Sequence, residues 1–354
     1  MVQGPTPAIT KSLLLLTLNR PGDVCRFMKM GKSDFEKLLN EPVYRSFYIP
    51  KKRNGKRKLE APSGLLKKKQ RWLNHHLQAY YLQVKSNAAH GFVALPKGEN
   101  QRANVVQNAL PHVGKRHLLN IDLKDFFQNI SGKRVYELFK GPYFQFSDQV
   151  AIALSLLSTY QGHLPTGAPS SPVLSNWVCL ELDQALEVHC ACLGMTYTRY
   201  ADDLTFSRDV PFSRAEVEAL VALIEQHDFK INRRKMRLTG PNRQQQVTGV
   251  VVNERLSIDR RQLKKIRAML HDAEKSGLEK ATDRHLGKSG SALVQQQHFV
   301  AKLQGNVAWV GQVRGKNDPM YLRFAASLTV LKQRLKELEA AGYLPFDARA
   351  DRWD

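Results

Sequence analysis

Two adjacent carboxylates, Asp202 and Asp203, lie in the middle of a strand-like run that extends over residues 197–207. The residues on both sides favour extended structure, so we expect a hairpin turn that holds the pair against the edge of a sheet. Side-by-side carboxylates repel each other, and a protein that places them together usually has a cation to neutralise them. The alternative is a solvated turn that is acidic by chance, since a match to one short motif remains a hypothesis.

A second acidic position favours the cation site over the solvated turn. Asp122 ends the apolar run of residues 118–121, eighty positions before the pair. One Asp at a strand end and two at a hairpin tip are what a two-metal phosphoryl-transfer centre requires, and oxygen ligands beside phosphates favour Mg²⁺. We therefore predict that Asp122, Asp202 and Asp203 are the catalytic residues and the ligands of two Mg²⁺ ions. Asp122 and Asp202 are expected to bridge the ions, and Asp203 to support the site.

The charge of the chain predicts a nucleic-acid partner. The sequence has 54 Lys and Arg residues against 32 Asp and Glu, which gives a net charge of +22. The excess is concentrated in residues 45–75, which hold eleven basic residues and one acid. Such a field favours a polyanion, although a run of charge that is only solvated is the usual alternative.

The apolar runs and the cysteines indicate the cellular compartment of the protein. The apolar run of residues 13–18 is too short to span a bilayer. The four cysteines lack the spacing of zinc ligands and fit reduced thiols. We expect a cytoplasmic protein with no membrane partner.

The pattern of the chain predicts an α+β middle followed by a helical tail. Two strand-like runs within residues 47–62 are joined by Asn54-Gly55, the strongest short signal for a hairpin turn. Helices are expected over residues 63–85, 148–160, 172–192 and 213–228, a strand over 247–253, and helices beyond it. Asp259 is a candidate cap for the first helix of the tail. The last helix carries an apolar stripe of Tyr321, Phe324, Leu328, Leu331, Leu335 and Leu338.

These segments, in this order, resemble the motifs of the reverse transcriptases. The basic hairpin resembles the fingers, Asp122 begins the first catalytic motif, and Tyr200-Ala-Asp-Asp203 is the hallmark third motif. Residues 164–172 resemble the second motif, residues 232–235 the later Lys-bearing segment, and residues 247–253 the primer-grip strand. The resemblance covers residues 45–345.

The resemblance implies a right-hand polymerase of the α+β class, with an antiparallel palm sheet and a helical C-terminal thumb. The expected parts are an N-terminal helical extension over residues 1–40, fingers over 41–115, a palm with interleaved fingers elements over 116–253, and the thumb and C-terminal tail over 254–354.

Two further segments are similar to those of bacterial retron reverse transcriptases, Asn87-Ala-Ala-His90 and Val247-Thr-Gly249. This implies an RNA-directed DNA polymerase that copies part of a cognate structured non-coding RNA into branched multicopy single-stranded DNA. Priming from an internal 2′-hydroxyl and a role in anti-phage defence are implied too. The implied partners are that RNA, its DNA product, dNTPs and a separate effector protein. Two alternatives stay open: another bacterial reverse transcriptase (defence, diversity-generating or CRISPR-associated), and a catalytically idle RNA-binding protein with the same fold.

The expected dNTP-binding residues are Lys52, Arg57, Phe127, Thr166, Gly167 and Lys235. Lys52 and Arg57 lie where a finger could clamp the triphosphate, and Arg offers a bidentate fork. Phe127 has the position that excludes a 2′-hydroxyl by bulk, and Lys235 could protonate or neutralise the leaving pyrophosphate. Thr166 stands where many reverse transcriptases have Gln.

The expected RNA-binding residues are Lys67, Lys68, Lys69, Asn87, His90, Thr248, Arg314 and Lys316. The three lysines continue the basic finger, where they would displace counterions from phosphates. Asn87, His90 and Thr248 belong to the retron-type segments. Arg314 and Lys316 lie in a Gly-flanked loop of the basic tail. For Asn87 and His90, the alternative is that they only tie the fingers to the palm by hydrogen bonds.

Overall fold

The computed structural model describes residues 7–51, 55–95, 103–287 and 292–340. The chain divides into two compact units, Met1–Thr248 and Gly249–Asp354. Each unit has its own core, and the three acids expected to bind metal, Asp122, Asp202 and Asp203, all belong to the first unit. None of the helices within the described residues combines the length and the apolar character that crossing a bilayer requires.

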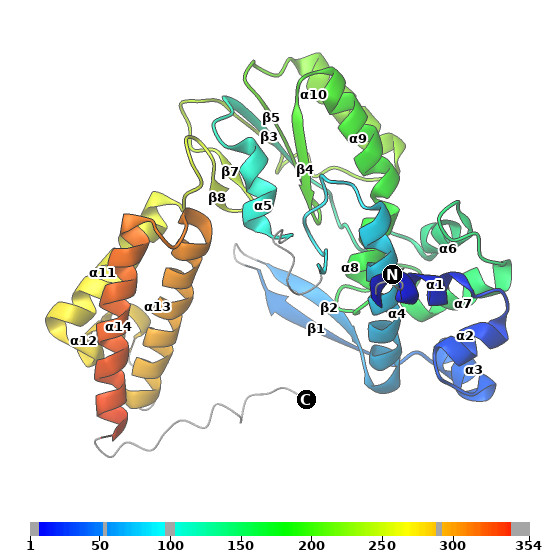
Figure 1. Ribbon diagram of the computed structural model, residues 1–354, viewed down its shortest axis with the longest axis horizontal. Coiled ribbons are helices and arrows are strands. Elements are labelled where there is room, and N and C mark those ends of the chain that lie inside the picture. The colour runs from blue at the N-terminus through cyan, green and yellow to red at the C-terminus, as the bar shows by residue number, and fades with distance from the viewer. Residues whose placement is uncertain (1–6, 52–54, 96–102, 288–291, 341–354) are drawn as a thin grey trace, which may run out of the picture. The chain divides into compact units, whose positions relative to one another are not determined.

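A four-stranded antiparallel sheet forms the centre of the first unit (Figure 1), with the strand order β4-β5-β3-β6. The strands are β3 (His117–Asp122), β4 (Thr196–Tyr200), β5 (Asp203–Arg208) and β6 (Arg237–Thr239). Apolar residues such as Leu119, Ile121 and Phe206 are buried in the core. Helix α9 (Leu180–Cys192) packs against β4, and α10 (Arg214–Gln226) packs against α9. The sheet thus has a rigid backing while the strand ends that carry the acids remain accessible.

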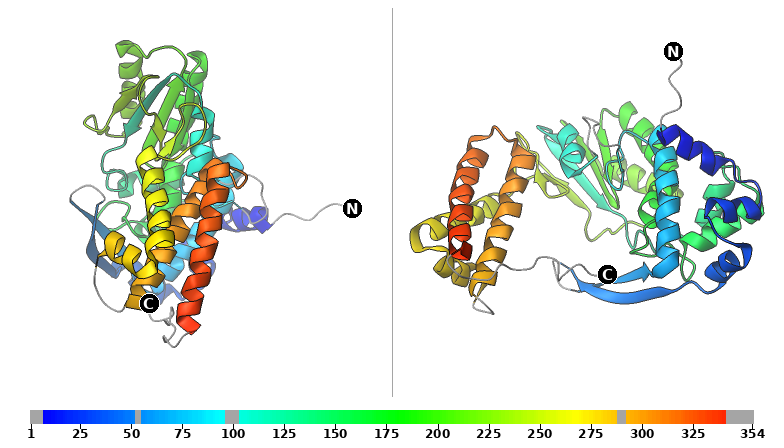
Figure 2. Two further views of the ribbon diagram at one scale, coloured as in Figure 1. Left: turned by 90° about the vertical axis from the view of Figure 1, so that its left-hand side faces the viewer. Right: turned by 60° about the horizontal axis from the view of Figure 1, so that its bottom comes forward.

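A long basic hairpin precedes the sheet. Strands β1 (Tyr44–Pro50) and β2 (Lys56–Pro62) pair antiparallel, as the turn signal predicts, and Asn54 of that turn lies outside the described residues. Most of the hairpin is exposed, and burial begins only towards the end of β2. Figure 2 shows the hairpin leading into helix α4 (Gly64–Val84), which agrees with the expected helix over residues 63–85.

Further helices enclose α4. They are α1 (Pro7–Leu16), α2 (Pro21–Phe27), α3 (Lys32–Asn40), α6 (Gly132–Lys140), α7 (Asp148–Ser158) and α8 (Ser171–Val178). Helices α1, α7 and α8 contact α4 directly. Leu73, Leu77 and Tyr81 of α4 are completely buried in the resulting core, because these positions recur on one face of the helix. The short helix α5 (Val105–Ala109) and the 3₁₀ turn η1 (Leu110–His112) connect this layer to β3.

Two elements that the sequence predicts as continuous are each interrupted in the structure. The helix expected over 172–192 is two helices, α8 and α9, because Cys179 has ψ −6° instead of the value near −42° of a regular helix. The strand expected over 247–253 is two short strands, β7 (Gln246–Val247) and β8 (Val250–Val251). Thr248 and Gly249 between them have φ of 48° and 85°, a left-handed backbone that cannot continue a strand.

The second unit is helical, as the pattern of the tail predicts. It contains α11 (Arg260–Ser276), α12 (Leu278–Leu286), α13 (Ala292–Arg314) and α14 (Pro319–Ala340), with α13 against α14 and α11 against α12. Asp259 caps α11 by accepting a hydrogen bond from the Arg261 amide at 2.7 Å. Of the predicted stripe on α14, Phe324, Leu328 and Leu331 are buried, whereas Leu338 is exposed.

Candidate active site

Three carboxylates come together where β3 and β5 lie side by side. Asp122, the last residue of β3, is paired in register with Asp203, the first residue of β5. Asp202 lies in the turn between β4 and β5, and its carbonyl accepts a hydrogen bond from the Leu123 amide at 2.9 Å. The predicted hairpin with acids at its tip and a third acid at a neighbouring strand end is therefore present.

Burial and mutual repulsion make the charged forms of Asp202 and Asp203 less favourable. Burial raises the pKa of Asp203 to about 6, and the carboxylates of Asp202 and Asp122 add to this effect. Burial also raises the pKa of Asp202, with a further contribution from Asp122. By its solvent-accessible surface, Asp203 is nevertheless exposed to water at the start of β5. A site that disfavours its own negative charge in this way is one that a bound cation would stabilise.

Lys235 supplies a positive charge to this site. Its Nζ lies 2.8 Å from Oδ1 and 3.1 Å from Oδ2 of Asp122, a residue 113 positions away in the chain. A turn beginning at Asn232 positions it, since the Asn232 amide donates to the Asp122 carbonyl and the Lys235 amide donates to the Asn232 carbonyl. The hydrogen bond to Asp122 raises the pKa of Lys235. The structure thus places the ammonium group of Lys235 beside Asp122.

The donor chemistry of the site fits Mg²⁺. All three acidic side chains offer carboxylate oxygens, the ligands that Mg²⁺ prefers. Within the described residues, no three His, Cys, Asp or Glu side chains are already arranged as a metal cage. Both carboxylate oxygens of Asp122 lie within hydrogen-bond distance of the ammonium nitrogen of Lys235. Asp122, Asp202 and Asp203 are the residues that would hold the metal.

The hairpin carries positive charge towards the acids. Arg57 is exposed on β2, and its charge counteracts the rise in the pKa of Asp202. Lys52, the other residue expected to clamp a triphosphate, lies outside the described residues. The root of the hairpin is fixed to the second motif, because the Glu60 amide donates to the Thr166 carbonyl at 3.0 Å. Glu60 also accepts a hydrogen bond from His163 at 2.9 Å.

Thr166 and Gly167 face the root of this hairpin. Gly167 has φ of 140°, and a Cβ there would lie 3.2 Å from the Glu60 carbonyl oxygen, so the close approach favours glycine. The Thr166 hydroxyl accepts a hydrogen bond from Nε2 of the Gln128 side chain at 3.1 Å. Phe127, next to Gln128, is partly buried against Phe126, with ring centroids 5.3 Å apart. The ring of Phe127 is therefore held by aromatic packing rather than free in solvent.

The lysines expected to bind RNA have different environments. Lys68 is exposed and Lys67 is partly exposed on α4. Lys69 donates to the Met28 carbonyl at 2.5 Å and to the Lys29 carbonyl at 3.3 Å, and so it closes the end of α2. Lys67 and Lys68 are consequently the better placed of the three for a phosphate.

The Asn87–His90 segment is joined to the sheet through its backbone. The His90 amide donates to the Arg199 carbonyl at 2.9 Å, and the Arg199 amide donates to the Ala88 carbonyl at 2.8 Å. Burial lowers the pKa of His90 to about 4, so its imidazole is neutral at physiological pH. The side chain of Asn87 is exposed. Thr248, the other residue from a retron-type segment, lies in the left-handed turn after β7.

The two basic residues of the tail also differ. Arg314 is nearly buried, with an ion pair to Asp318 at 2.9 Å and a hydrogen bond to the Ser257 hydroxyl at 2.8 Å. Lys316, two residues later, is exposed. The guanidinium of Arg314 is thus engaged within its own unit, which leaves Lys316 as the accessible base of this loop.

A buried ion pair behind the acidic turn was not predicted from the sequence. Arg199 of β4 and Asp183 of α9 are both completely buried, and Arg199 Nη2 lies 2.6 Å from Asp183 Oδ2. The available signal was the position of Arg199, a permanently charged residue inside the strand-like run of residues 197–207.

The chain is similar to proteins of known type. Residues 49–252 match the family described as "Reverse transcriptase (RNA-dependent DNA polymerase)". The chain is 38% identical over 262 residues to the Retron Mx65 reverse transcriptase of Myxococcus xanthus, which covers 69% of this chain and 59% of that protein. It is 35% identical over 176 residues to the Retron Ec86 reverse transcriptase of Escherichia coli, covering 49% and 54%. With the Retron Mx162 reverse transcriptase of Myxococcus xanthus it shares 32% identity over 325 residues, covering 82% and 61%.

The chain spans between 54% and 61% of the length of these three relatives. Among solved structures, apo telomerase from Candida tropicalis has a TM-score of 0.47 and 10% sequence identity, over 82% of this chain and 61% of that one. This likeness is too weak to carry an argument about function.

Proposed function

Because this chain belongs to the reverse transcriptase family, with the right-hand polymerase fold, we propose that it is an RNA-directed DNA polymerase of the retron type. The observation that carries the proposal is the register of the sheet, which pairs Asp122 with Asp203, the residue that directly follows Asp202. Intact acids in this arrangement favour an active polymerase over an idle RNA-binding protein with the same fold.

Each part of the site has a chemical task in this proposal. Two Mg²⁺ ions on the acids would activate the 3′-hydroxyl and stabilise the charge of the leaving pyrophosphate. Asp122, Asp202 and Asp203 would supply the carboxylate oxygens that hold these ions. Arg57 steers the triphosphate towards the acids, helped by Lys52. Lys235 neutralises the negative charge that develops on the pyrophosphate.

The finer proposal concerns the product. The enzyme copies part of a cognate structured RNA into branched multicopy single-stranded DNA, starting from an internal 2′-hydroxyl. The retron-type segments Asn87–His90 and Val247–Gly249 support this proposal, as do the retron names of the relatives. The enzyme works in the cytoplasm on dNTPs, in anti-phage defence, with a separate effector protein. Lys67, Lys68 and Lys316 are the exposed bases proposed to contact the RNA.

Sequencing the nucleic acid that copurifies with the protein tests this function. A DNA strand joined to RNA through a 2′,5′ branch is expected. Unbranched cDNA with scattered start sites would favour another bacterial reverse transcriptase instead. If the purified protein extends no annealed primer on any RNA template in the presence of Mg²⁺ and dNTPs, the polymerase proposal itself fails.

Phe127→Ala is expected to relax discrimination between dNTPs and rNTPs. An aromatic ring beneath the sugar leaves no space for a 2′-hydroxyl, and truncation opens that space. Steric exclusion of one small group is worth about 1–3 kcal/mol, which corresponds to a loss of selectivity of roughly 10- to 200-fold. The measurement is the ratio of kcat/KM for a dNTP to that for the matching rNTP.

Phe126→Ala serves as the control for this substitution. Phe126 is buried and packs against Phe127, so its truncation perturbs the fold without opening the proposed sugar gate. An unchanged selectivity ratio in Phe127→Ala, or an equal change in both variants, would mean that Phe127 serves only packing.

Charge reversal of Lys67 and Lys68 to Glu is expected to weaken RNA binding and to flatten its dependence on salt. The slope of log affinity against log salt should become shallower by about 0.7–0.9 for each phosphate that the protein no longer neutralises. The slope is measured by titrating RNA at several salt concentrations. Lys69→Gln is the matched control, because Lys69 binds backbone carbonyls of the protein. A slope unaltered by the double reversal would show that Lys67 and Lys68 are only solvated.

A further inference from the structure

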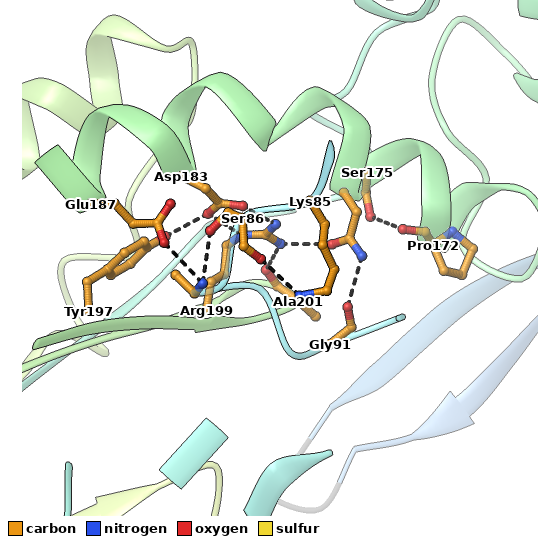
Figure 3. Close-up of polar contacts among 12 residues, drawn as sticks. Lys85, Ser86, Gly91, Pro172, Ser175, Asp183, Glu187, Tyr197, Arg199 and Ala201 are labelled. Carbon is orange, nitrogen blue, oxygen red and sulfur yellow. Dashed lines mark hydrogen bonds and ion pairs between the residues drawn. The ribbon is translucent and has the colours of Figure 1, made fainter. Parts of the chain in front are cut away.

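The buried Arg199 connects the acidic turn to the helix behind it (Figure 3). Its Nε lies 2.8 Å from Asp183 Oδ1 and its Nη2 lies 2.6 Å from Asp183 Oδ2, a bidentate pair between β4 and α9. Tyr197 donates its hydroxyl hydrogen to the same carboxylate at 2.8 Å. Asp183 and Arg199 both have no exposed surface. The guanidinium is therefore held in one orientation, since a planar fork on a carboxylate has little freedom.

The remaining nitrogen of this guanidinium reaches the acidic turn. Arg199 Nη1 donates to the carbonyl of Ala201 at 3.1 Å and to Asn176 Oδ1 at 3.1 Å. Ala201 immediately precedes Asp202 and has φ of 57°. A residue other than glycine in this left-handed conformation persists only where its surroundings impose it, and such residues cluster at functional sites.

The backbone of residue 91 restrains the turn from another side. Asn176 Nδ2 donates to the Gly91 carbonyl at 2.9 Å, so the same Asn holds both Arg199 and this segment. A Cβ built on Gly91 would lie 2.4 Å from the Ala201 amide nitrogen and 3.0 Å from the Tyr200 carbonyl carbon. Only glycine permits this approach without a shift of the turn.

We propose that Arg199 is a positioning residue for the metal site, which holds Ala201 in its left-handed conformation and so fixes where Asp202 and Asp203 present their carboxylates. Asp183 orients Arg199, Asn176 links it to the segment before the turn, and Gly91 allows that segment to pack against the turn. The inference rests on the proposed function only in taking the two acids to be metal ligands. It assigns a task to an ion pair that touches neither metal nor substrate.

The test measures metal binding apart from synthesis. Mn²⁺ is the probe, and free Mn²⁺ is followed by electron paramagnetic resonance in titrations of the full chain without nucleotide. Partners that orient metal ligands typically contribute about ten- to hundred-fold to metal affinity. We expect Arg199→Lys, which keeps the charge but loses the fork, to raise the Kd for Mn²⁺ by about that factor. The Mg²⁺ concentration for half-maximal synthesis should rise in parallel, and RNA affinity should stay constant.

Two milder variants keep the proposal testable if Arg199→Lys does not fold. Asn176→Ala leaves the ion pair with Asp183 in place and removes one link to the turn. Gly91→Ala leaves every side-chain partner in place and displaces the turn by contact with its backbone. Both variants are expected to raise the Kd for Mn²⁺ clearly, with only a small fall in the unfolding temperature.

Arg208→Lys is the matched control. Arg208 lies at the opposite end of β5, pairs with Glu216 through two nitrogens and donates to the carbonyls of Val210 and Pro211. Its substitution should cost stability without changing the affinity for Mn²⁺. A loss of Mn²⁺ affinity in Arg208→Lys equal to that in Arg199→Lys, or unchanged affinity in all three variants of the Arg199 cluster, would overturn the positioning role.

The outcomes separate this role from the proposed function. If the wild-type protein binds Mn²⁺ and the cluster variants bind it more weakly, yet the wild-type protein synthesises no DNA on RNA, the polymerase proposal fails and the positioning role stands. If the wild-type protein makes DNA and the cluster variants bind Mn²⁺ with normal affinity, the positioning role fails and the polymerase proposal stands. Wild-type protein that binds no Mn²⁺ would contradict the positioning role, whereas primer extension by the wild-type protein decides the polymerase proposal.

Discussion

Asparagine in place of Asp202 is expected to abolish DNA synthesis while RNA binding survives. The substitution keeps the size of the side chain and removes the charge that would hold the metal between Asp122 and Asp203. Metal ions supply several kcal/mol of transition-state stabilisation, so the rate of primer extension should fall by at least about a thousandfold. RNA affinity should change little, because the bases proposed to contact RNA lie on α4 and in the loop after α13.

The measurement is single-turnover extension of an annealed primer, with RNA affinity determined in parallel. Asp209→Asn is the matched control, since Asp209 is an exposed acid just past the other end of β5, paired with Lys115 at 3.0 Å. It should retain the wild-type rate. If Asp202→Asn still polymerises DNA, Asp202 is not required for catalysis. If both variants are equally inactive, the loss reflects a general effect of charge.

Asp183→Ala should be among the most destabilising single substitutions in the first unit. It leaves the completely buried Arg199 charged and without its counter-ion, and it takes the hydrogen-bond acceptor from Tyr197. Removing one partner of a buried ion pair costs about 3–5 kcal/mol. The loss should appear as a lower urea midpoint, with hydrogen exchange accelerated in α9 and β4.

Glu216→Ala offers a comparison in which the same kind of pair is less enclosed. Glu216 keeps about a quarter of its side chain exposed, at 26%, so water can solvate Arg208 after the substitution. A smaller loss of stability is expected than for Asp183→Ala. If Asp183→Ala lowers the free energy of unfolding by no more than Glu216→Ala does, the ion pair between Arg199 and Asp183 is not desolvated in solution.

The sequence predicted those elements whose position depends on residues close together in the chain. The hairpin β1–β2, helix α4 and the acids at the ends of β3 and β5 follow from turn residues, apolar periodicity and strand-ending carboxylates. The breaks at Cys179 and Thr248 did not, because neither residue type signals a change of backbone direction. Thr favours strands by propensity, yet Thr248 has a left-handed conformation with φ of 48°.

Contacts between distant segments were beyond the reach of sequence patterns. The basic Lys-bearing segment was identified, but the approach of Lys235 to Asp122 across 113 residues depends on the turn at Asn232. The charge of Arg314 suggested an RNA contact, whereas its ion pair with Asp318 engages it within the helical unit. Arg199 was overlooked for a related reason, since its partner Asp183 lies on another element and gives no signal in the neighbouring sequence.

The anchoring of the basic hairpin at one end has a mechanical consequence. Glu60 is fixed through its amide to Thr166 and through its carboxylate to His163, while the distal residues of both strands are exposed. Two-stranded ribbons with solvent on both faces are only marginally stable on their own. We therefore expect the hairpin to be fixed at its root and to bend along its exposed part. If Arg57 contacts a triphosphate as proposed, we expect any bending to occur in β1 and the first half of β2, while the loop at Thr166 and Gly167 stays in place.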